Sequence, residues 1–184
     1  QYFQRKVFIN GEEKFLPESR QRQTGLFTMQ SLVKGPLRLE GGVRVEFSKL
    51  KAEEDADLGT PALSRNFTTV SGSAGLAYDL SPAWRAGLTL SRSARAPSIE
   101  ELFANGPHAG TQAFEVGDPG LDPEKSIGIE ASIRKHSGPL KLTATAYYNR
   151  FSNFIFQAPT GEIEDDLPVF QYLQGKANYY GFEV

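Results

Sequence analysis

The chain has 184 residues with 20 Lys and Arg against 22 Asp and Glu, and its net charge of -2 predicts no electrostatic attraction to nucleic acid or anionic lipid. It has no cysteine, which excludes a disulfide framework, a zinc ribbon and a cysteine nucleophile. No apolar run approaches the ~20 residues that a transmembrane helix needs. The negative mean hydropathy does not exclude a membrane β-barrel, because half of each barrel strand faces a polar interior.

Strands are predicted along the whole chain because apolar and polar residues alternate with period two. Between residues 37 and 49 one parity is apolar and the other is charged or polar. The runs are about 10 to 14 residues long, roughly twice the usual soluble strand, and a tilted strand of that length spans a bilayer. The predicted strands cover 1–9, 22–34, 37–51, 66–80, 84–95, 124–135, 139–156 and 169–184.

The connections between these strands alternate between tight and long. The tight ones, at 35–36, 81–83 and 136–139, contain the Gly, Pro or Ser that sharp turns favour. The long ones cover 10–21, 53–65, 96–123 and 157–168. In an up-and-down sheet alternate connections lie at opposite edges, so one edge carries tight turns and the other carries long loops. This pattern is typical of an outer-membrane barrel and not of a soluble β-sandwich.

The predicted fold is therefore all-β, with antiparallel up-and-down strands forming a fragment of a large transmembrane β-barrel. The apolar parity should face lipid, because an outward charge at the bilayer midplane costs about 2–4 kcal/mol. The inward charges are expected to form cross-strand pairs, with direct substrate contact as the alternative; they are Arg44, Arg85, Arg134, Glu40, Glu46 and Glu130. Because the chain opens and stops inside strand-like runs, we expect it to be a piece of a longer protein.

The most distinctive segment is 91–130, SRSARAPSIEELFANGPHAGTQAFEVGDPGLDPEKSIGIE. It resembles TonB-dependent outer-membrane receptors, and the hairpin sequences at 146–155 and 180–183 are similar to the C-terminal barrel hairpins of that family. The residues of the segment that carry the resemblance are Arg95, Pro97, Gly117, Pro119, Glu124, Ser126 and Glu130. The asparagine at 105 and the histidine at 108 fall in an Asn-Gly-Pro-His element that resembles the subgroup linked with zinc uptake.

The resemblance implies a parent protein with a 22-stranded barrel, an N-terminal plug and a periplasmic box that contacts the TonB energy-coupling complex. Residues 1–184 would form about eight strands of that barrel, and the plug is absent from the chain. The implied partners are outer-membrane lipid, a small nutrient and TonB, reached through the missing plug. No resident cofactor is implied, although zinc or another metal is a candidate for the transported substrate.

The loop at 96–123 has properties that follow from its residues alone. Pro97 stops strand hydrogen bonding, and Ser98 is placed to cap a helical turn over 99–103 with Glu100 and Glu101 at its favourable N-terminal end. The Gly and Pro residues between 106 and 123 predict that the remainder has no regular structure. A long external loop folded against the barrel wall is expected, and such loops commonly carry binding residues.

His108 is the sharpest candidate for metal contact, with oxygen ligands from Glu115 and Asp118. The alternative is a structural loop histidine, because a strong metal site usually has several clustered His or Cys ligands. Substrate contact is also predicted for Glu100, Glu101 and Asn105. Acidic residues of the predicted loops 96–123 and 157–168 could draw a cation toward the receptor mouth, or could be ordinary solvated charge. In the loop 157–168 they are Glu162, Glu164, Asp165 and Asp166.

The function predicted from these features is energy-coupled uptake of a scarce nutrient, possibly a metal ion or metal chelate. The alternative is a passive or adhesive outer-membrane barrel. No enzyme signature is found. A Ser/His barrel hydrolase is disfavoured, because His108 and His136 are predicted at opposite edges. Because an isolated piece of wall has open edges and a bare apolar face, we expect it to self-associate, to bind detergent or to curl into a closed sheet.

Overall fold

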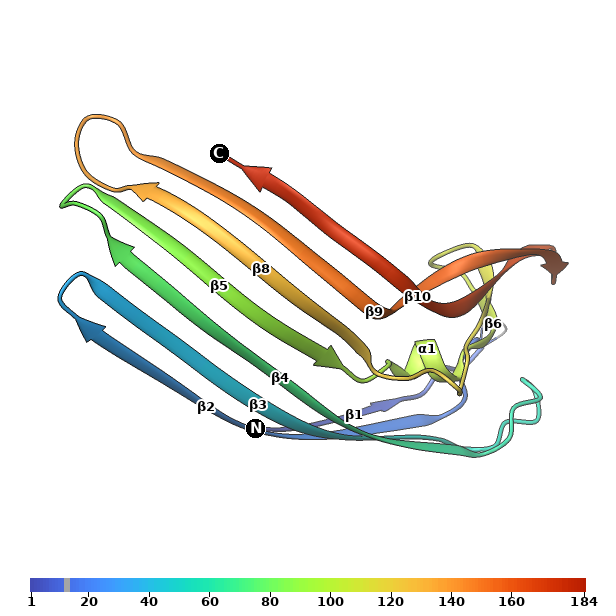
Figure 1. The fold of residues 1–184 in the computed structure, drawn as a ribbon. Coiled ribbons are helices and arrows are strands. Elements are labelled where there is room, and N and C mark those ends of the chain that lie inside the picture. The colour runs from blue at the N-terminus through green and yellow to red at the C-terminus, as the bar shows by residue number, and fades with distance from the viewer. Residues whose placement is uncertain (12–13) are drawn as a thin grey trace.

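The computed structural model describes residues 1–11 and 14–184. Eight strands form one curved wall: β1 (Tyr2–Val7), β2 (Ser19–Lys34), β3 (Leu37–Ala52), β4 (Leu63–Asp79), β5 (Trp84–Arg95), β8 (Glu124–Lys135), β9 (Leu142–Glu164) and β10 (Leu167–Glu183) (Figure 1). The connection between β5 and β8 contains a short helix, α1 (Ile99–Phe103), and two short strands, β6 (Asn105–His108) and β7 (Ala113–Val116). No helix of the described residues has the length and apolar character needed to cross a membrane.

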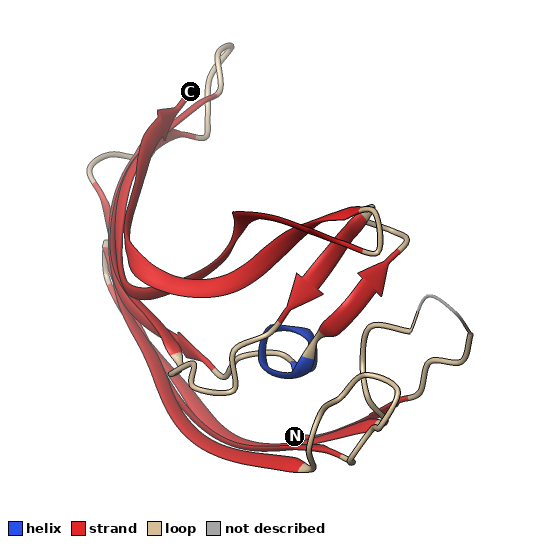
Figure 2. Ribbon diagram, turned by 90° about the vertical axis from the view of Figure 1, so that its right-hand side faces the viewer, coloured by secondary structure: helices blue, strands red, loops and turns tan. Residues whose placement is uncertain are grey.

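The strand order is β1-β2-β3-β4-β5-β8-β9-β10-β7-β6. Consecutive wall strands pair antiparallel, and β7 pairs in parallel with Val169–Gln171 of β10. Figure 2 shows that the wall is strongly curved and that α1, β6 and β7 lie on its concave side. This architecture confirms the predicted all-β, antiparallel fragment of a larger barrel.

The predicted long loop at 157–168 is wrong. β9 continues to Glu164, β10 starts at Leu167, and only Asp165 and Asp166 turn the chain between them. Both residues have positive φ, at 50° and 60°, as the two central residues of a type I′ hairpin turn require. Asp tolerates that conformation better than most residues, so two acidic residues that suggested a solvated loop instead make a tight turn.

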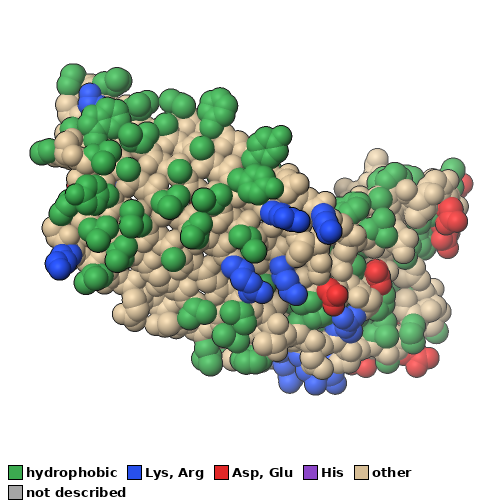
Figure 3. Space-filling model, in the orientation of Figure 1, with side chains coloured by type: hydrophobic (Ala, Val, Ile, Leu, Met, Phe, Trp, Pro, Cys, Tyr) green, Lys and Arg blue, Asp and Glu red, His purple; other side chains and the backbone are tan. Residues whose placement is uncertain are grey.

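Apolar side chains of one parity are exposed on the convex face. Leu39, Phe47, Leu90 and Ile127 are between 37% and 67% exposed, although they are large apolar residues in regular strands. Figure 3, which views this face, shows apolar side chains over the part of the wall next to the tight turns. The convex side is therefore the side predicted to face lipid.

Of the six inward charges, Arg44, Glu46, Arg85 and Glu40 have ion-pair partners within residues 1–11 and 14–184, and Arg134 and Glu130 have none there. Arg44 Nη2 lies 2.6 Å from Glu46 Oε2, along the same strand. Arg85 donates to both carboxylate oxygens of Asp79, at 2.6 and 3.0 Å, across the β4–β5 hairpin. The second pair is cross-strand, as expected, but its acid is Asp79, which the sequence pattern did not single out.

The hydrophobic core lies at one end of the concave side, where the β5–β8 connection packs against the wall. Its buried members come from both parts: Phe15, Leu16, Leu50, Ala52, Phe67, Ile99, Leu102, Phe103, Ala104, Leu121 and Ile155. This confirms that the long loop folds against the wall. We call this end the outer end and the end with the tight turns the turn end.

Candidate functional site

The β5–β8 connection is anchored by a capped helix. Ser98 Oγ accepts a hydrogen bond from the N–H of Glu101 at 3.1 Å, and the N–H of Ser98 donates to Glu101 Oε2 at 2.7 Å. The two bonds form a capping box, which satisfies backbone donors that the helix leaves free. The predicted cap and helical turn are both confirmed. The apolar side of the helix, Ile99, Leu102 and Phe103, is buried in the core.

Arg95 joins three elements at the base of the connection. Its guanidinium donates two hydrogen bonds to Glu101, at 2.8 and 2.9 Å, and two to Glu124, at 3.1 and 3.2 Å. Glu124 Oε2 also accepts from the N–H of Ile155 on β9 at 3.0 Å. Charge-assisted, bidentate pairs of this kind fix geometry well. Arg95 and Glu124 therefore hold the connection to the end of β5, the start of β8 and an interior position of β9.

Other residues singled out from the sequence also support the loop. Pro97 is fully buried. A Cβ on Gly117 would lie 2.8 Å from backbone atoms of Leu102 and Phe103, so only glycine fits there. Ser126 pairs with Ser93 in the β5–β8 ladder, and Pro119 and Glu130 are exposed. Pro97 and Gly117 therefore support the packing of the loop, whereas a role for Pro119, Ser126 and Glu130 stays a prediction.

The prediction that residues 106–123 have no regular structure is wrong. β6 and β7 form a hairpin with pairs from Asn105↔Val116 to His108↔Ala113, and β7 adds to β10. Pro107 is tolerated because β6 is the edge strand, where a missing N–H costs little. The hairpin places His108 and Glu115 side by side.

His108 and Glu115 form the centre of a small polar cluster. His108 Nδ1 lies 2.9 Å from Glu115 Oε1, and Thr111 Oγ1 donates to the same oxygen at 2.8 Å. Tyr172 Oη donates to Glu115 Oε2 at 3.5 Å, and the Phe15 ring stacks on the imidazole with a centroid distance of 4.0 Å. Burial and the Glu115 carboxylate raise the pKa of Tyr172 to about 12. Glu115 is only 2% exposed, so its carboxylate depends on these donors.

Asp118 does not join this cluster. Its carboxylate accepts from the N–H of Gly120 at 2.7 Å, and its own N–H donates to the carbonyl of Glu101 at 2.9 Å. Within residues 1–11 and 14–184 there is no group of three or more His, Cys, Asp or Glu arranged to hold a metal. The structure thus brings two of the three predicted metal ligands together, and metal contact by His108 stays a prediction.

The predicted substrate contacts are engaged in contacts within the chain. Glu100 pairs with Arg5 of β1, and Glu101 pairs with Arg95. Burial raises the pKa of Glu100, but hydrogen bonds from its own N–H, Arg5 and Ser98 outweigh burial and leave the pKa lowered. Asn105 Nδ2 donates to the carbonyl of Leu58 at 2.9 Å. Asn105 alone of these three also borders an open cleft.

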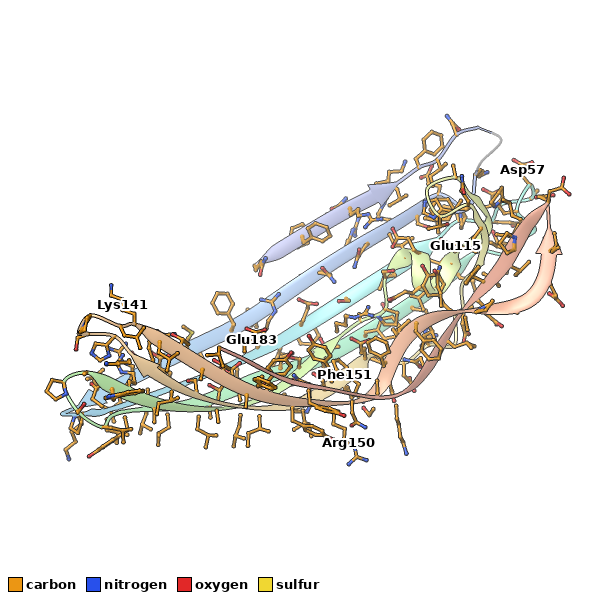
Figure 4. The ribbon with its side chains drawn as sticks, turned by 90° about the horizontal axis from the view of Figure 1, so that it is seen from above. Asp57, Glu115, Lys141, Arg150, Phe151 and Glu183 are labelled. Atoms are coloured by element: carbon orange, nitrogen blue, oxygen red, sulfur yellow. The ribbon has the colours of Figure 1, made fainter. Side chains whose placement is uncertain are left out.

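The cleft lies at the outer end and has a volume of about 390 Å³. All four connections at that end contribute to it: Gly11 and Lys14; Asp57 and Leu58; Asn105, Gly106, Pro107 and Phe114; and Glu164 and Asp165. Figure 4 shows Asp57 and Glu115 at this end of the molecule and Lys141 at the other. We call this feature the outer cleft.

Lys14 is the one cation among the described residues that line the outer cleft, and it is held by two acids. Its ammonium pairs with Asp55 and lies 3.6 Å from Asp57 Oδ2. The hydrogen bond from Lys14 is the main cause that lowers the pKa of Asp55. Sequence analysis missed Lys14, Asp57 and Tyr172, because each lies in a different segment and no local motif links them.

A comparison with protein families decides the identity of the fold. The family described as TonB dependent receptor-like, beta-barrel matches residues 7–184. The chain belongs to this family. Its wall, outer cleft and folded-in connection are therefore parts of a TonB-dependent receptor-like barrel.

Solved structures have the same fold. A double mutant of the Serratia marcescens hemophore receptor HasR, in complex with its hemophore and heme, matches with a TM-score of 0.77 and 18% identity, over 98% of this chain and 34% of that one. The copper transporter OprC matches with a TM-score of 0.76 and 20% identity, over 89% of this chain and 25% of that one. The alcaligin outer-membrane receptor FauA of Bordetella pertussis matches with a TM-score of 0.59 and 20% identity, over 90% of this chain and 27% of that one. The chain thus spans about a quarter to a third of the length of these proteins.

Proposed function

We propose that this chain forms part of the barrel of an outer-membrane receptor that takes up a scarce nutrient, a metal ion or metal chelate, by energy-coupled transport. The observation that carries the proposal is the outer cleft, where all four connections of the outer end meet around polar groups. External loops that converge on one cleft form a place where a nutrient binds before it enters the barrel.

The dimensions of the convex face support a position in a membrane. From Leu37 to Phe47 the strand rises roughly 34 Å, which at a tilt of about 40° covers about 26 Å of membrane normal, close to the ~25 Å apolar band of such barrels. Tyr78 and Trp84 lie near the tight β4–β5 turn, where interfacial aromatic residues are expected. The turn end would face the periplasm and the outer cleft the outside.

The charge of the outer cleft supports a cationic or metal-containing substrate. Asp57, Glu164 and Asp165 line it against the single cation Lys14 among the described residues. The similar receptors include a hemophore receptor bound to heme, a copper transporter and an alcaligin receptor. Haem, copper and ferric siderophores are therefore the substrates to test beside zinc, for which the resemblance of the Asn105–His108 element is the reason.

In the proposed mechanism, substrate passes from the outer cleft into the barrel of the whole receptor. The plug and the TonB contact that this step needs lie outside this chain. The proposed role is transport and not catalysis, and it rests on family membership. The alternative is a passive or adhesive barrel with the same wall. The two differ in their need for energy.

The deciding experiment is uptake by cells that express the full-length receptor as the sole route for the substrate. Zinc, copper, haem and a ferric siderophore are offered separately at nanomolar concentration, with and without an uncoupler of the inner-membrane proton gradient. Accumulation that the uncoupler abolishes supports energy-coupled uptake. Accumulation that survives the uncoupler favours the passive barrel, and no accumulation of any substrate would remove the transport proposal.

The role of the outer cleft is tested by neutralising its acids. The double variant Asp57→Asn/Glu164→Gln should weaken binding of the transported cation about tenfold or more, since two attractive charges of roughly 1 kcal/mol each are lost near the ligand. The matched control is Glu53→Gln/Glu54→Gln, which removes two acids of the β3–β4 connection that do not line the cleft. Equal loss in both variants would show a general charge effect and not a binding site.

A further inference from the structure

The convex face carries a basic cleft that the net charge of the chain conceals. Arg20 and Arg22 of β2 and Lys49 and Lys51 of β3 line a hollow of about 110 Å³. The ladder sets Arg20 directly opposite Lys51 and Arg22 directly opposite Lys49. The prediction of no attraction to anionic lipid considered only the total charge. In the structure the positive and negative charges are unevenly distributed, and these four cations share one small area of the convex face.

This arrangement is unfavourable for the protein alone. Like charges directly opposite each other on neighbouring strands repel. No ion pair within residues 1–11 and 14–184 involves any of the four. Lys6, opposite Arg20 on β1, does have an acid, Glu18, at 2.8 Å. An anion between the two strands would relieve the repulsion.

The basic cleft lies where the apolar face ends. On β3, Phe47 is the last apolar residue of the outward parity, and Lys49 and Lys51 follow it. Farther along the same convex face, Arg92 and Arg150 both lie opposite Ile127, and Lys125 lies two residues before Ile127 on β8, toward the outer end. Figure 3 shows Lys and Arg side chains gathered beside the apolar area, and Figure 4 shows Arg150 pointing away from the concave side.

We infer that the cleft of Arg20, Arg22, Lys49 and Lys51 binds the phosphate group of a membrane lipid in the leaflet that surrounds the outer end. The inference rests on the proposed membrane position. Charge complementarity and continuity with the apolar face fit a lipid, whose acyl chains would cover the face beside Phe47 while its headgroup reaches the cleft. The fork of an arginine matches phosphate oxygens bidentately, and a lysine adds a point charge.

The lipid class follows from the number of charges. Four cations suit a phosphomonoester, which carries between one and two negative charges near neutral pH. A zwitterionic headgroup would bring its own cation into the cleft. The expected order of affinity is therefore phosphatidic acid above phosphatidylcholine with the same acyl chains.

The test uses the full-length receptor in a neutral detergent, with lipid binding measured by native mass spectrometry. The variant Arg22→Gln/Lys49→Gln removes one directly opposed pair. The matched control Lys34→Gln/Lys141→Gln removes two exposed cations near the turn end. The first variant should bind phosphatidic acid at least about tenfold more weakly than the wild type, since each basic residue near an anionic headgroup contributes roughly a factor of five. The control should bind it as the wild type does.

Equal affinity for the two lipids in the wild-type receptor, or equal loss in both variants, would overturn the inference. Displacement of the lipid by inorganic phosphate at a similar concentration would also overturn it, because the site would then recognise free anion. Uptake is measured on the wild-type receptor and on both variants. A failed transport proposal would show as no uptake by the wild type with its lipid preference intact, and a failed lipid site as equal lipid binding in the two variants with uptake by the wild type intact.

Discussion

Arg95 and Glu101 face each other through two parallel hydrogen bonds of 2.8 and 2.9 Å, and Glu101 also closes the capping box of α1. One carboxylate thus ties the helix to the end of β5. The loop that borders the outer cleft therefore depends on a planar guanidinium at position 95.

Arg95→Lys should loosen the β5–β8 connection, because an ammonium cannot make the two parallel bonds. The expected loss is about 1–2 kcal/mol, toward the low end for charged hydrogen bonds because the Arg95 side chain is 44% exposed. Hydrogen exchange of residues 99–121 in the full receptor measures it. Arg38→Lys is the control, since the contact of Arg38 with Glu40 is 3.7 Å long and exposed. Unchanged protection in the Arg95 variant would refute the anchoring role.

Gly117→Ala should destabilise the same loop by roughly 1–3 kcal/mol, because the added Cβ would meet backbone atoms at 2.8 Å that cannot move without shifting α1. The control is Gly41→Ala on β3, where the nearest atom to an added Cβ is the Ser73 carbonyl oxygen at an ordinary 3.6 Å. Thermal unfolding and proteolysis of the connection are the readouts. Equal behaviour of the two variants would contradict the close packing of Gly117 on the helix.

Acid should release the loop through Glu100. The pKa of Glu100 in the folded protein is below its ordinary value of 4.5, so its contribution to stability is complete above that pH and is lost as the pH falls through the folded-state pKa. Pepsin cleavage within 96–123 should therefore rise below about pH 4. The Glu100→Gln variant should be cleaved readily at higher pH, and its cleavage rate should depend less on pH. A pH profile identical to that of the wild type would exclude Glu100 as the titrating group.

His108→Ala should weaken zinc binding by the full receptor at least about tenfold if the imidazole is a ligand. Calorimetry in detergent measures the affinity. His136→Ala is the matched control, because His136 lies beside the tight turn at the other end. Unchanged zinc affinity in the His108 variant would leave His108 as a structural residue stacked on Phe15 and bonded to Glu115.

The isolated chain should associate in water. The apolar convex face is exposed, and residues 172–183 of β10 pair with β9 on one side and with no described strand on the other. The predicted open edge is wrong for residues 169–171 of β10, because β7 pairs with them. Sedimentation without detergent should show oligomers. A stable monomer with an open sheet would contradict the lipid-facing role of the convex side.

The period-two pattern was enough to predict the wall, because each strand has one apolar and one polar face and short turns set the pairing. The helix at 99–103 was predictable from Ser98 and Glu101, which lie close in the sequence. The β6–β7 hairpin was not, because its Gly and Pro residues act as breakers unless an edge position tolerates them. The outer cleft depends on contacts such as Asn105 to Leu58 and His108 to Phe15, between segments that only the folded wall brings together.

Accessibility of the two ends of the wall tests the central claim most directly, and these 184 residues contain no Cys that would itself be labelled. The variants Glu162→Cys, in the β9–β10 hairpin, and Ser137→Cys, in the tight turn before β9, are made in the full receptor. Intact cells are treated with a membrane-impermeant maleimide, with the wild-type receptor as background. We predict labelling at position 162 in intact cells and at position 137 only after the outer membrane is permeabilised. Equal labelling at both positions in intact cells, or the reverse order, would contradict a membrane-spanning wall with its cleft outside.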